Sequence, residues 1–450
     1  MNPVVILIIG VALLIAMIIV LRVNAFVALI TAAIIISLLA PGDLADKVSR
    51  VAEAFGSVVG AIGIVIALAA VIGKCLMDSG AADRIVRSFL KALGEKRASV
   101  ALMGSGFVLS VPVFFDTVFY LLVPLARSLW RRTQKNYVLY LTAIVAGAGI
   151  THTLVPPTPG PLFMANSFNV DLGVMIGMGI LVGLPTAALG LFVCKLINRF
   201  VDIPMRPYVG ESEPEPLDDD QLPGFWISVS PIILPVVLIS INTVTKALDM
   251  GGQVAQITAV LGNPNLALLF SAAIAMFVLI RSRGLSLKEL SGKMDTALMS
   301  GGIIILITAG GGAFGAMLRA AGVQDAVKGF IDAGGGGLGL TLLLLAFAVS
   351  SIIKFAQGSG TVAMITTASM FAAMGISEEM LGCNLVYLAM AIGSGSLVGD
   401  WMNNSGFWIF ARMGGLTEIE TLKSWTILTA ALGLIALAFT LLFASVLPLV

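Results

Sequence analysis

The sequence predicts an all-α polytopic membrane protein made of two inverted repeats, each with five spans, a re-entrant hairpin and a broken helix. First, 58% of its 450 residues are hydrophobic and 11% are charged, and the mean hydropathy is +1.04. A soluble chain is about a quarter charged. Second, the apolar stretches 98–126 and 338–374 are each interrupted in the middle. Third, the two halves of the chain resemble each other in order.

The first repeat, residues 1–201, begins with the apolar run from Val4 to Leu21. It lacks the basic segment and the small-residue cleavage site of a signal peptide, so we expect it to be retained as the first span. Further spans are predicted at 25–39, 57–77 and 172–196. A short loop and amphipathic turn is expected at 41–55, and a basic surface helix at 81–97.

Residues 98–126 predict the first re-entrant hairpin, with its tip near Ser110 to Asp116. The stretch is too long for one span of about 20 residues and too short for two. Basic residues flank it on both sides, at Arg84, Arg87, Lys91, Lys96, Arg97, Arg127, Arg131, Arg132 and Lys135. Because Lys and Arg favour the cytoplasmic side, the chain must enter the bilayer and return. Irregular backbone at that depth persists only inside protein or beside water, so we expect the hairpin to border a substrate path.

Proline, glycine and charge predict the remaining boundaries. Four prolines between residues 156 and 161 forbid a continuous helix over 137–168, so this span is expected to be broken. A polar cytoplasmic linker at 202–224 divides the chain. In the second repeat, residues 225–450, spans are predicted at 225–241, 266–280, 300–318 and 425–447, a glycine-rich segment at 320–337, a hairpin at 338–374 and a broken helix at 384–411.

Internal matches indicate that the two halves are inverted repeats. Residues 73–83 and 315–325 both read G-x-x-L-x-x-x-G-x-x-D, Asp116 corresponds to Gly360, and Gly149 corresponds to Gly395, always about 245 residues apart. Five spans per half is an odd number, so one half is upside down relative to the other. Placing the basic segments inside predicts that the N-terminus lies outside. Paired interruptions in inverted repeats are typical of secondary transporters with a site near the bilayer midplane.

Asp116 and His152 are the first candidates for binding the coupling ion, because ionisable residues inside a membrane are costly and often functional. Asp116 could carry a proton or bind a cation, or it could cap the second arm of the hairpin. His152, the only histidine, could transfer protons near neutral pH, or it could satisfy backbone groups freed by the break. Thr117, Thr151 and Thr153 add hydroxyl groups for a substrate.

Lys354 in the second hairpin could hold a substrate carboxylate, together with the free amides at a half-helix N-terminus. It could equally extend to the membrane surface, as many lysines do. Gln357, Ser359 and Thr361 follow it around a glycine break and are further candidates for substrate binding.

Asp400, Asn403 and Asn404 interrupt the second broken helix. Asp400 could bind the coupling cation, and the two asparagines could hydrogen-bond substrate hydroxyls. Capping of the two half-helices explains the same residues equally well.

Soluble-enzyme motifs are absent from the sequence, and GSG and GSGS lack the preceding strand of a nucleotide loop. Nothing predicts a nucleic-acid partner, a cofactor or a metal site, and three scattered cysteines do not form a disulfide framework. Because two aspartates lie in apolar segments, an intramembrane aspartyl protease is an alternative. That class has the motifs Tyr-Asp and Gly-x-Gly-Asp, whereas this chain has Phe-Asp and Leu-Val-Gly-Asp at these places. A passive channel and a structural or scaffold protein also stay open.

The whole chain resembles the gluconate permease family, the gluconate/proton symporters of the ion transporter superfamily. The resemblance is carried by FFDTVFYLLVPLA, THTLVPPTPGP, AQGSGTVAM and GSGSLVGDWMNNSGFW. It implies proton-coupled uptake of sugar acids across the bacterial inner membrane, with the hairpins and broken helices as the site, and it allows a homodimer.

Three positions depart from the family pattern. Asp116 stands where the family usually has Glu, while Thr158 and Trp401 stand where it usually has His. Sodium coupling through Asp116 and Asp400, or transport of a different carboxylate or an amino acid, therefore stays open. The sequence as a whole predicts a symporter that imports a small organic anion with a cation, with the proton as the first choice.

Overall fold

The computed structural model describes residues 2–201, 203–206, 218–326 and 339–449. Among these residues the regular structure is helical and no strand occurs, and eight helices are long and apolar enough to cross a membrane by length and composition. Helices satisfy every backbone group internally, which a chain in lipid must do. The predicted all-α polytopic membrane protein is therefore confirmed.

The first half contains the predicted spans and interruptions. Its elements are α1 Pro3–Ile15, η1 Ala16–Val20, α2 Ala25–Leu39, α3 Asp46–Asp78, α4 Ala81–Leu93, η2 Glu95–Arg97, α5 Ala98–Leu109, α6 Phe115–Thr133, α7 Tyr137–Leu154, α8 Pro159–Ser167 and α9 Leu172–Phe200. Helix α3 begins well before the expected start at 57, because the amphipathic turn predicted at 41–55 continues into the span as one helix.

The described part of the second half has short helices that the sequence did not reveal. Its elements are η3 Asp219–Gln221, α10 Phe225–Ala247, α11 Gly252–Leu261, α12 Pro264–Arg283, α13 Leu287–Ala320, α15 Gly339–Gln357, α16 Gly360–Ala373, α17 Glu378–Leu381, α18 Val386–Gly395, α19 Ser405–Gly414, α20 Glu418–Thr421, η4 Leu422–Thr426 and α21 Ile427–Val446. Helix α11, between α10 and α12, is the longest unexpected helix among the described residues, and its ten residues are too few for a span.

The helix breaks fall where proline and glycine predict them. They lie at 110–114 between α5 and α6, at 155–158 between α7 and α8, at 358–359 between α15 and α16, and at 396–404 between α18 and α19. Parts of the predicted linker at 202–224 and of the glycine-rich segment at 320–337, and residue 338, lie outside the described residues. The inverted relation of the two halves and the re-entrant path of each hairpin stay predictions.

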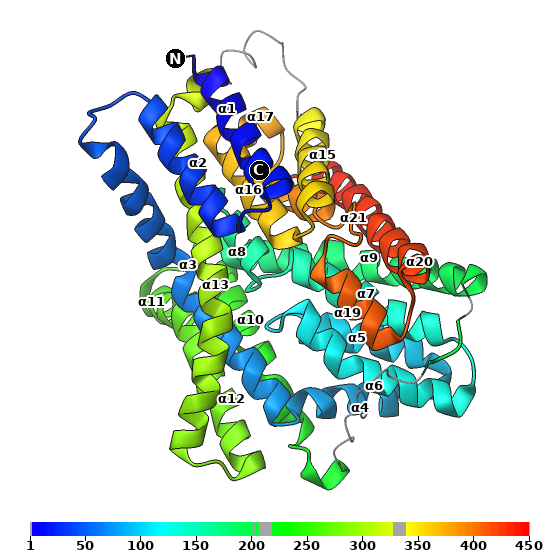
Figure 1. Ribbon diagram of the computed structural model, residues 1–450. Helices are drawn as coiled ribbons and strands as arrows, with labels where there is room; N and C mark the ends of the chain where they lie inside the picture. Colours follow the sequence, from blue (N-terminus) through cyan, green and yellow to red (C-terminus); the bar gives the residue numbers. More distant parts are fainter. Residues whose placement is uncertain (1, 202, 207–217, 327–338, 450) are drawn as a thin grey trace.

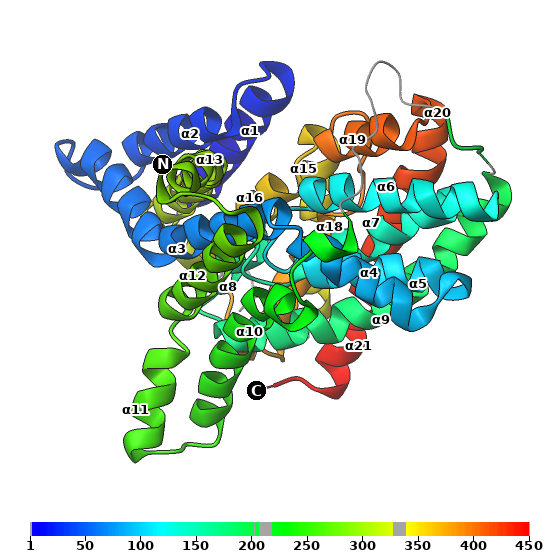
Figure 2. The same cartoon turned by 90° about the horizontal axis from the view of Figure 1, so that it is seen from below.

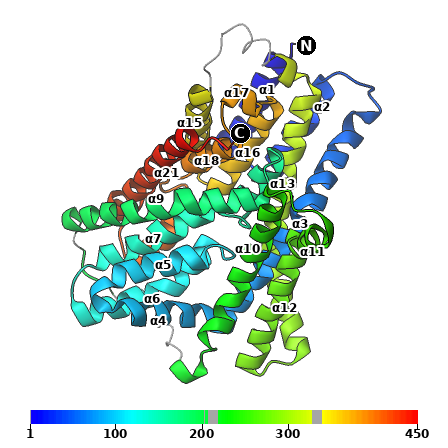
Figure 3. The same ribbon diagram turned by 180° about the vertical axis from the view of Figure 1, so that it is seen from behind.

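Two groups of helices meet along α13 (Figures 1 and 2). One group contains α2, α3 and α13, and the other contains α5, α7 and α9, with α9 lying against α10 as Figure 3 shows from behind. Helix α16 packs against α13 and α8 and so lies where the groups join. The start of α1 and the end of α13 lie at the upper end of Figure 1, and α4 and the turn between α12 and α13 lie at the lower end.

Close packing of two helices requires a glycine at position 147 in the core. Helix α7 is buried along nearly its whole length, and it meets α5 at Gly147. A Cβ atom on Gly147 would lie 1.9 Å from the carbonyl oxygen of Met103. Small residues permit this approach of two helices in a membrane.

Candidate functional site

A cavity of about 460 Å³ lies among the helix interruptions. Its walls come from the start of α6, the end of α7, the turn between α15 and α16, and the segment 396–404, with α13 and α21 completing them. The residues predicted from the sequence that line it are Asp116, Thr117, His152, Thr153, Lys354, Gln357, Ser359, Thr361, Asp400, Asn403 and Asn404. Helix ends bring backbone amides and polar side chains to one place, which a continuous helix cannot do.

Lys354 and Asp400 form a buried ion pair in the wall of this cavity. The Lys354 Nζ atom lies 3.0 Å from Oδ2 of Asp400, and the two side chains are 2% and 6% exposed. The ammonium group also donates to the carbonyl oxygen of Gly358. Asn404 Nδ2 donates to Oδ1 and Oδ2 of Asp400 at 2.7 and 2.8 Å. The alternative that Lys354 extends to the membrane surface is therefore wrong, because its cation is held by a carboxylate inside the protein.

The turn between α15 and α16 depends on Gly358. This residue has a φ of +88°, and a Cβ atom on it would lie 2.2 Å from the carbonyl oxygen of Asn403. Ser359 follows as the N-cap of α16, where its hydroxyl accepts a hydrogen bond from the amide of Val362 at 3.3 Å. Gln357 Nε2 donates to the carbonyl oxygen of Ser359 at 3.0 Å. The hairpin tip thus packs directly against the segment 396–404 at Gly358 and Asn403.

We expect Gly358→Ala to lower the free energy of unfolding by about 2–4 kcal/mol, because it adds left-handed strain and a clash with backbone. The melting temperature of the purified protein and its substrate uptake should both fall. Gly149→Ala is the matched control, since it lines the same cavity and its new Cβ atom would meet only Val145 Cγ1 at 3.9 Å. Equal melting temperatures for the two variants would refute the close contact at Gly358.

The two asparagines of the segment 396–404 both line the cavity, and one of them, Asn404, also caps a helix. Asn404 Oδ1 accepts a hydrogen bond from the Gly406 amide at 3.1 Å, so the capping alternative is confirmed for this residue. Asn403 Nδ2 donates to the carbonyl oxygen of Phe355 at 2.7 Å, while its Oδ1 is buried with no partner among the described residues. Asn403, which lines the cavity, therefore carries a buried acceptor without a partner among the described residues.

Asp116 lies in the first turn of α6 and is half-buried. The N-cap of α6 is Phe114, with no side-chain capping bond, so the alternative that Asp116 caps this helix is wrong. Across the described part of the chain no hydrogen bond or ion pair reaches the Asp116 carboxylate, although the cavity brings it near Asp400 and Lys354. A carboxylate in this state can take up a proton without breaking a hydrogen bond or an ion pair.

His152 lies on α7, with its ring edge-on to Phe114 at a centroid distance of 6.1 Å. Its Nδ1 atom is buried and has no hydrogen-bond partner within the described ranges. The alternative that this side chain satisfies freed backbone groups is therefore not supported at Nδ1. One turn of α7 presents His152 and Gly149 to the same cavity.

Thr151 is the one predicted site residue that does not line the cavity. Its hydroxyl donates to the carbonyl oxygen of Gly147 at 3.2 Å, and the side chain is fully buried. The neighbouring residue on a helix points about 100° away, which separates Thr151 from His152. Its predicted role in substrate binding has no support from this placement.

Sequence reasoning missed the contributions of α13 and α21. Ser300 and Ile304 of α13, and Thr429 and Leu432 of α21, line the cavity. These residues lie on regular apolar helices without a break, so no local signal marks them. Ser300, a polar residue at the start of an apolar run, is the one that could have been singled out.

The comparisons with known proteins cover nearly the whole chain. The model described as "GntP family permease" matches residues 2–446. A gluconate permease of Pseudomonas aeruginosa is 33% identical over 95% of this chain and 94% of that protein. The Gnt-II system L-idonate transporter of Escherichia coli is 30% identical over 99% and 100%. The solved YdaH transporter of Alcanivorax borkumensis has a TM-score of 0.66 at 14% identity, covering 94% of this chain and 98% of its own, and shows the same fold.

Proposed function

We propose, because the chain belongs to the GntP family of permeases, that it imports a sugar acid together with a cation, the proton being our first choice. Family membership makes the chain a membrane transporter and not an enzyme. The bacterial homologues and the apolar helices place it in the inner membrane. Substrate class, symport and the coupling ion are the parts that we propose.

The chemistry of the cavity suits a sugar acid such as the gluconate or L-idonate of the relatives' names. Such a molecule carries one carboxylate and several hydroxyl groups. Lys354 can bind the carboxylate, and Asn403, Thr117 and Ser359 can hydrogen-bond the hydroxyls. The volume of about 460 Å³ lies within the usual range for small-molecule sites, roughly 300–1,000 Å³.

The buried pair of Lys354 and Asp400 is the observation that carries the proposal. Of the described residues lining the cavity, one is a lysine and two are carboxylates, Asp116 and Asp400. With His152 neutral, the site has a net charge of −1, so a bound anion would bring it to −2 inside the protein. Adding a like charge to such a site is costly. A cation that enters with the substrate removes this cost, which is the physical basis for symport.

The proton has a suitable acceptor in this site. Asp116 takes part in no hydrogen bond within the described residues, and protonating it offsets the charge of the incoming carboxylate. A proton on Asp400 would weaken its hold on Lys354 and free the ammonium group for the substrate. His152 lies in the same cavity and offers a further proton acceptor.

The way in which the two helix groups join supports alternating access. Helices α8 and α16 contact α13, and the hairpin tip and α13 both line the cavity. We propose that the hairpins and broken helices move against the remaining spans, as inverted-repeat transporters do. The basic residues of α4 and α12 favour a cytoplasmic location for the lower end of Figure 1, and hence an external N-terminus.

Uptake by purified protein in proteoliposomes tests the proposal. We expect gluconate or L-idonate to accumulate above its external concentration when the outside is acidic, and a protonophore to abolish this accumulation. Uncharged glucose should not accumulate, because it lacks the carboxylate that Lys354 binds. Accumulation driven only by sodium would assign the coupling ion to sodium, and uptake that never exceeds the substrate gradient would identify a channel.

A further inference from the structure

A second cavity, of about 440 Å³, lies farther along α13 from the first. Its walls come from α3, α8, the end of α13 and the end of α16. The first cavity contacts α13 at Ser300 and Ile304, whereas the second contacts it from Gly312 to Arg319. A rise of about 1.5 Å per residue puts Ser300 and Arg319 about 28 Å apart along the helix.

Arg319 gives this second cavity its chemical character. It is the one charged residue among the described residues that line the cavity, and its side chain is exposed. Within the ranges that the structure covers, its guanidinium group has no hydrogen bond and no ion pair. The planar fork of N–H groups on arginine matches a carboxylate with two parallel hydrogen bonds. An exposed arginine without a partner in a concave site is thus ready to bind an anion.

Polar groups surround Arg319 in the same cavity. Asn166, Ser167 and Asn169, at and after the end of α8, line it, and their side chains make no hydrogen bond within the described part of the chain. Amide and hydroxyl groups can pair with the hydroxyls of a polyhydroxy acid. The cavity therefore offers a cation and neutral polar groups, and its described lining lacks the carboxylates that give the first cavity its negative charge.

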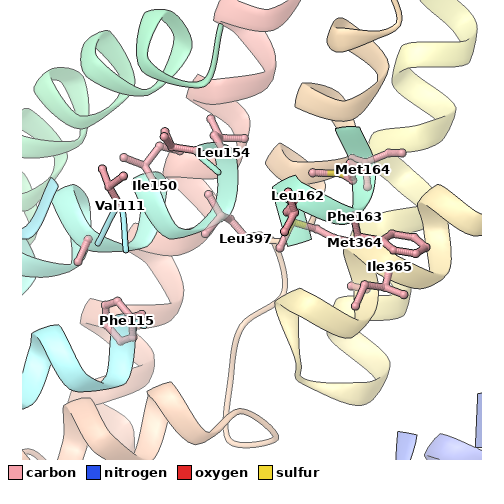
Figure 4. Close-up of a cluster of buried hydrophobic side chains, with 14 of the residues drawn as sticks. Val111, Phe115, Ile150, Leu154, Leu162, Phe163, Met164, Met364, Ile365 and Leu397 are labelled. Atoms are coloured by element: carbon pink, nitrogen blue, oxygen red, sulfur yellow. The ribbon is translucent and has the colours of Figure 1, made fainter. Parts of the chain in front are cut away.

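Packed side chains separate the two cavities. Figure 4 shows Phe163 of α8 beside Met364 and Ile365 of α16. A Cβ atom on Gly311 of α13 would lie 2.1 Å from Cγ2 of Ile365, and Ser369 donates to the Gly311 carbonyl oxygen at 2.8 Å. This contact leaves no room for a sugar acid between α13 and α16. We call this contact of Gly311 with Ile365 and Ser369 the seal, and the two cavities lie on opposite sides of it. In alternating access, such a contact closes the path between the substrate site and one side of the membrane.

We propose that the second cavity is an outer vestibule, in which Arg319 binds the substrate carboxylate before the seal opens. This inference rests on the proposed function, because it takes the sugar acid as the ligand. The end of α13 lies with the start of α1, which the charge distribution places outside. Arg319 therefore acts on substrate arriving from outside, and it is separate from the site that contains Lys354 and Asp400.

Thiol labelling tests the vestibule without relying on transport. Ala316, one helical turn before Arg319, also lines the cavity, and the native cysteines 75, 194 and 383 are buried. In right-side-out vesicles, Ala316→Cys should react with an external anionic methanethiosulfonate. Adding Arg319→Gln should slow that reaction at least about tenfold, as the loss of local electrostatic attraction predicts. A cationic reagent should not be slowed, and gluconate should protect the thiol only when Arg319 is present.

Two controls make the result specific. Lys47→Gln removes a cation at the same end of the molecule but outside the cavity, and should leave the Ala316→Cys rate unchanged. Ser49→Cys, exposed at the start of α3, should react equally with and without Arg319. If Ala316→Cys reacts at the same rate whether or not Arg319→Gln is also present, or is labelled only from the inside, the vestibule is overturned. Ala316→Cys protein that binds no sugar acid, yet shows the charge-dependent labelling, would contradict the proposed function alone.

Discussion

Asp116→Asn is expected to abolish accumulation of the sugar acid while leaving exchange of substrate across the membrane intact. Asparagine has the shape of a protonated aspartate but cannot release a proton. The variant should therefore bind substrate with the same net charge as the wild-type site in which Asp116 is protonated, and carry substrate in both directions. Without proton release, the pH gradient cannot drive net uptake, so the ratio of internal to external substrate should fall to one.

The measurement compares proton-driven uptake with counterflow of labelled substrate in proteoliposomes. Asp295→Asn is the control, because it neutralises an exposed carboxylate of α13 that does not line the cavity. It should accumulate substrate as the wild type does. If Asp116→Asn still accumulates substrate in response to the pH gradient, Asp116 does not carry the proton.

Lys354→Met is expected to abolish uptake and to lower the free energy of unfolding by about 3–5 kcal/mol, since it leaves the charge of Asp400 buried without its partner. The pair is 3.0 Å apart and its side chains are 2% and 6% exposed, so hydration compensates only in part for the lost ammonium group. Asp400→Asn should be destabilising for the converse reason. The double variant should recover much of the stability, because no unpaired charge is then buried.

Transport distinguishes the role of Lys354 in the site from its role in folding. The double variant should remain inactive toward sugar acids, because no cation is left to bind the carboxylate. Melting of the purified proteins in detergent provides the stability comparison. Lys246→Met is the control, since Lys246 is 61% exposed where it pairs with Asp171, and it should cost at most about 1 kcal/mol. A stable, inactive Lys354→Met single variant would show that the ion pair with Asp400 does not stabilise the fold. An active double variant would show that Lys354 does not bind the substrate carboxylate.

The sequence predicts most of the polar residues of this site, because the chemistry lies at helix breaks. Proline, glycine and a local drop in hydropathy mark a helix break. Polar residues beside a break are costly to place in a membrane, so they are often functional. Asp116, His152, Lys354 and Asp400 were all found in this way, and all line one cavity. Ser300 was missed and Thr151 does not face the cavity, because the direction of a side chain on a regular helix depends on its neighbours.

Sequence alone determined that this protein is a helical membrane protein of a transporter family, and where its helices are interrupted. Hydropathy, proline and glycine act within a few residues, so the linear order of residues is enough to locate their effects. Only the tertiary structure paired Lys354 with Asp400, left Asp116 without a partner among the described residues, and placed Arg319 in a second cavity beyond the seal. These features arise because packing brings distant segments together, and the energy of a buried charge depends on which groups that packing places around it.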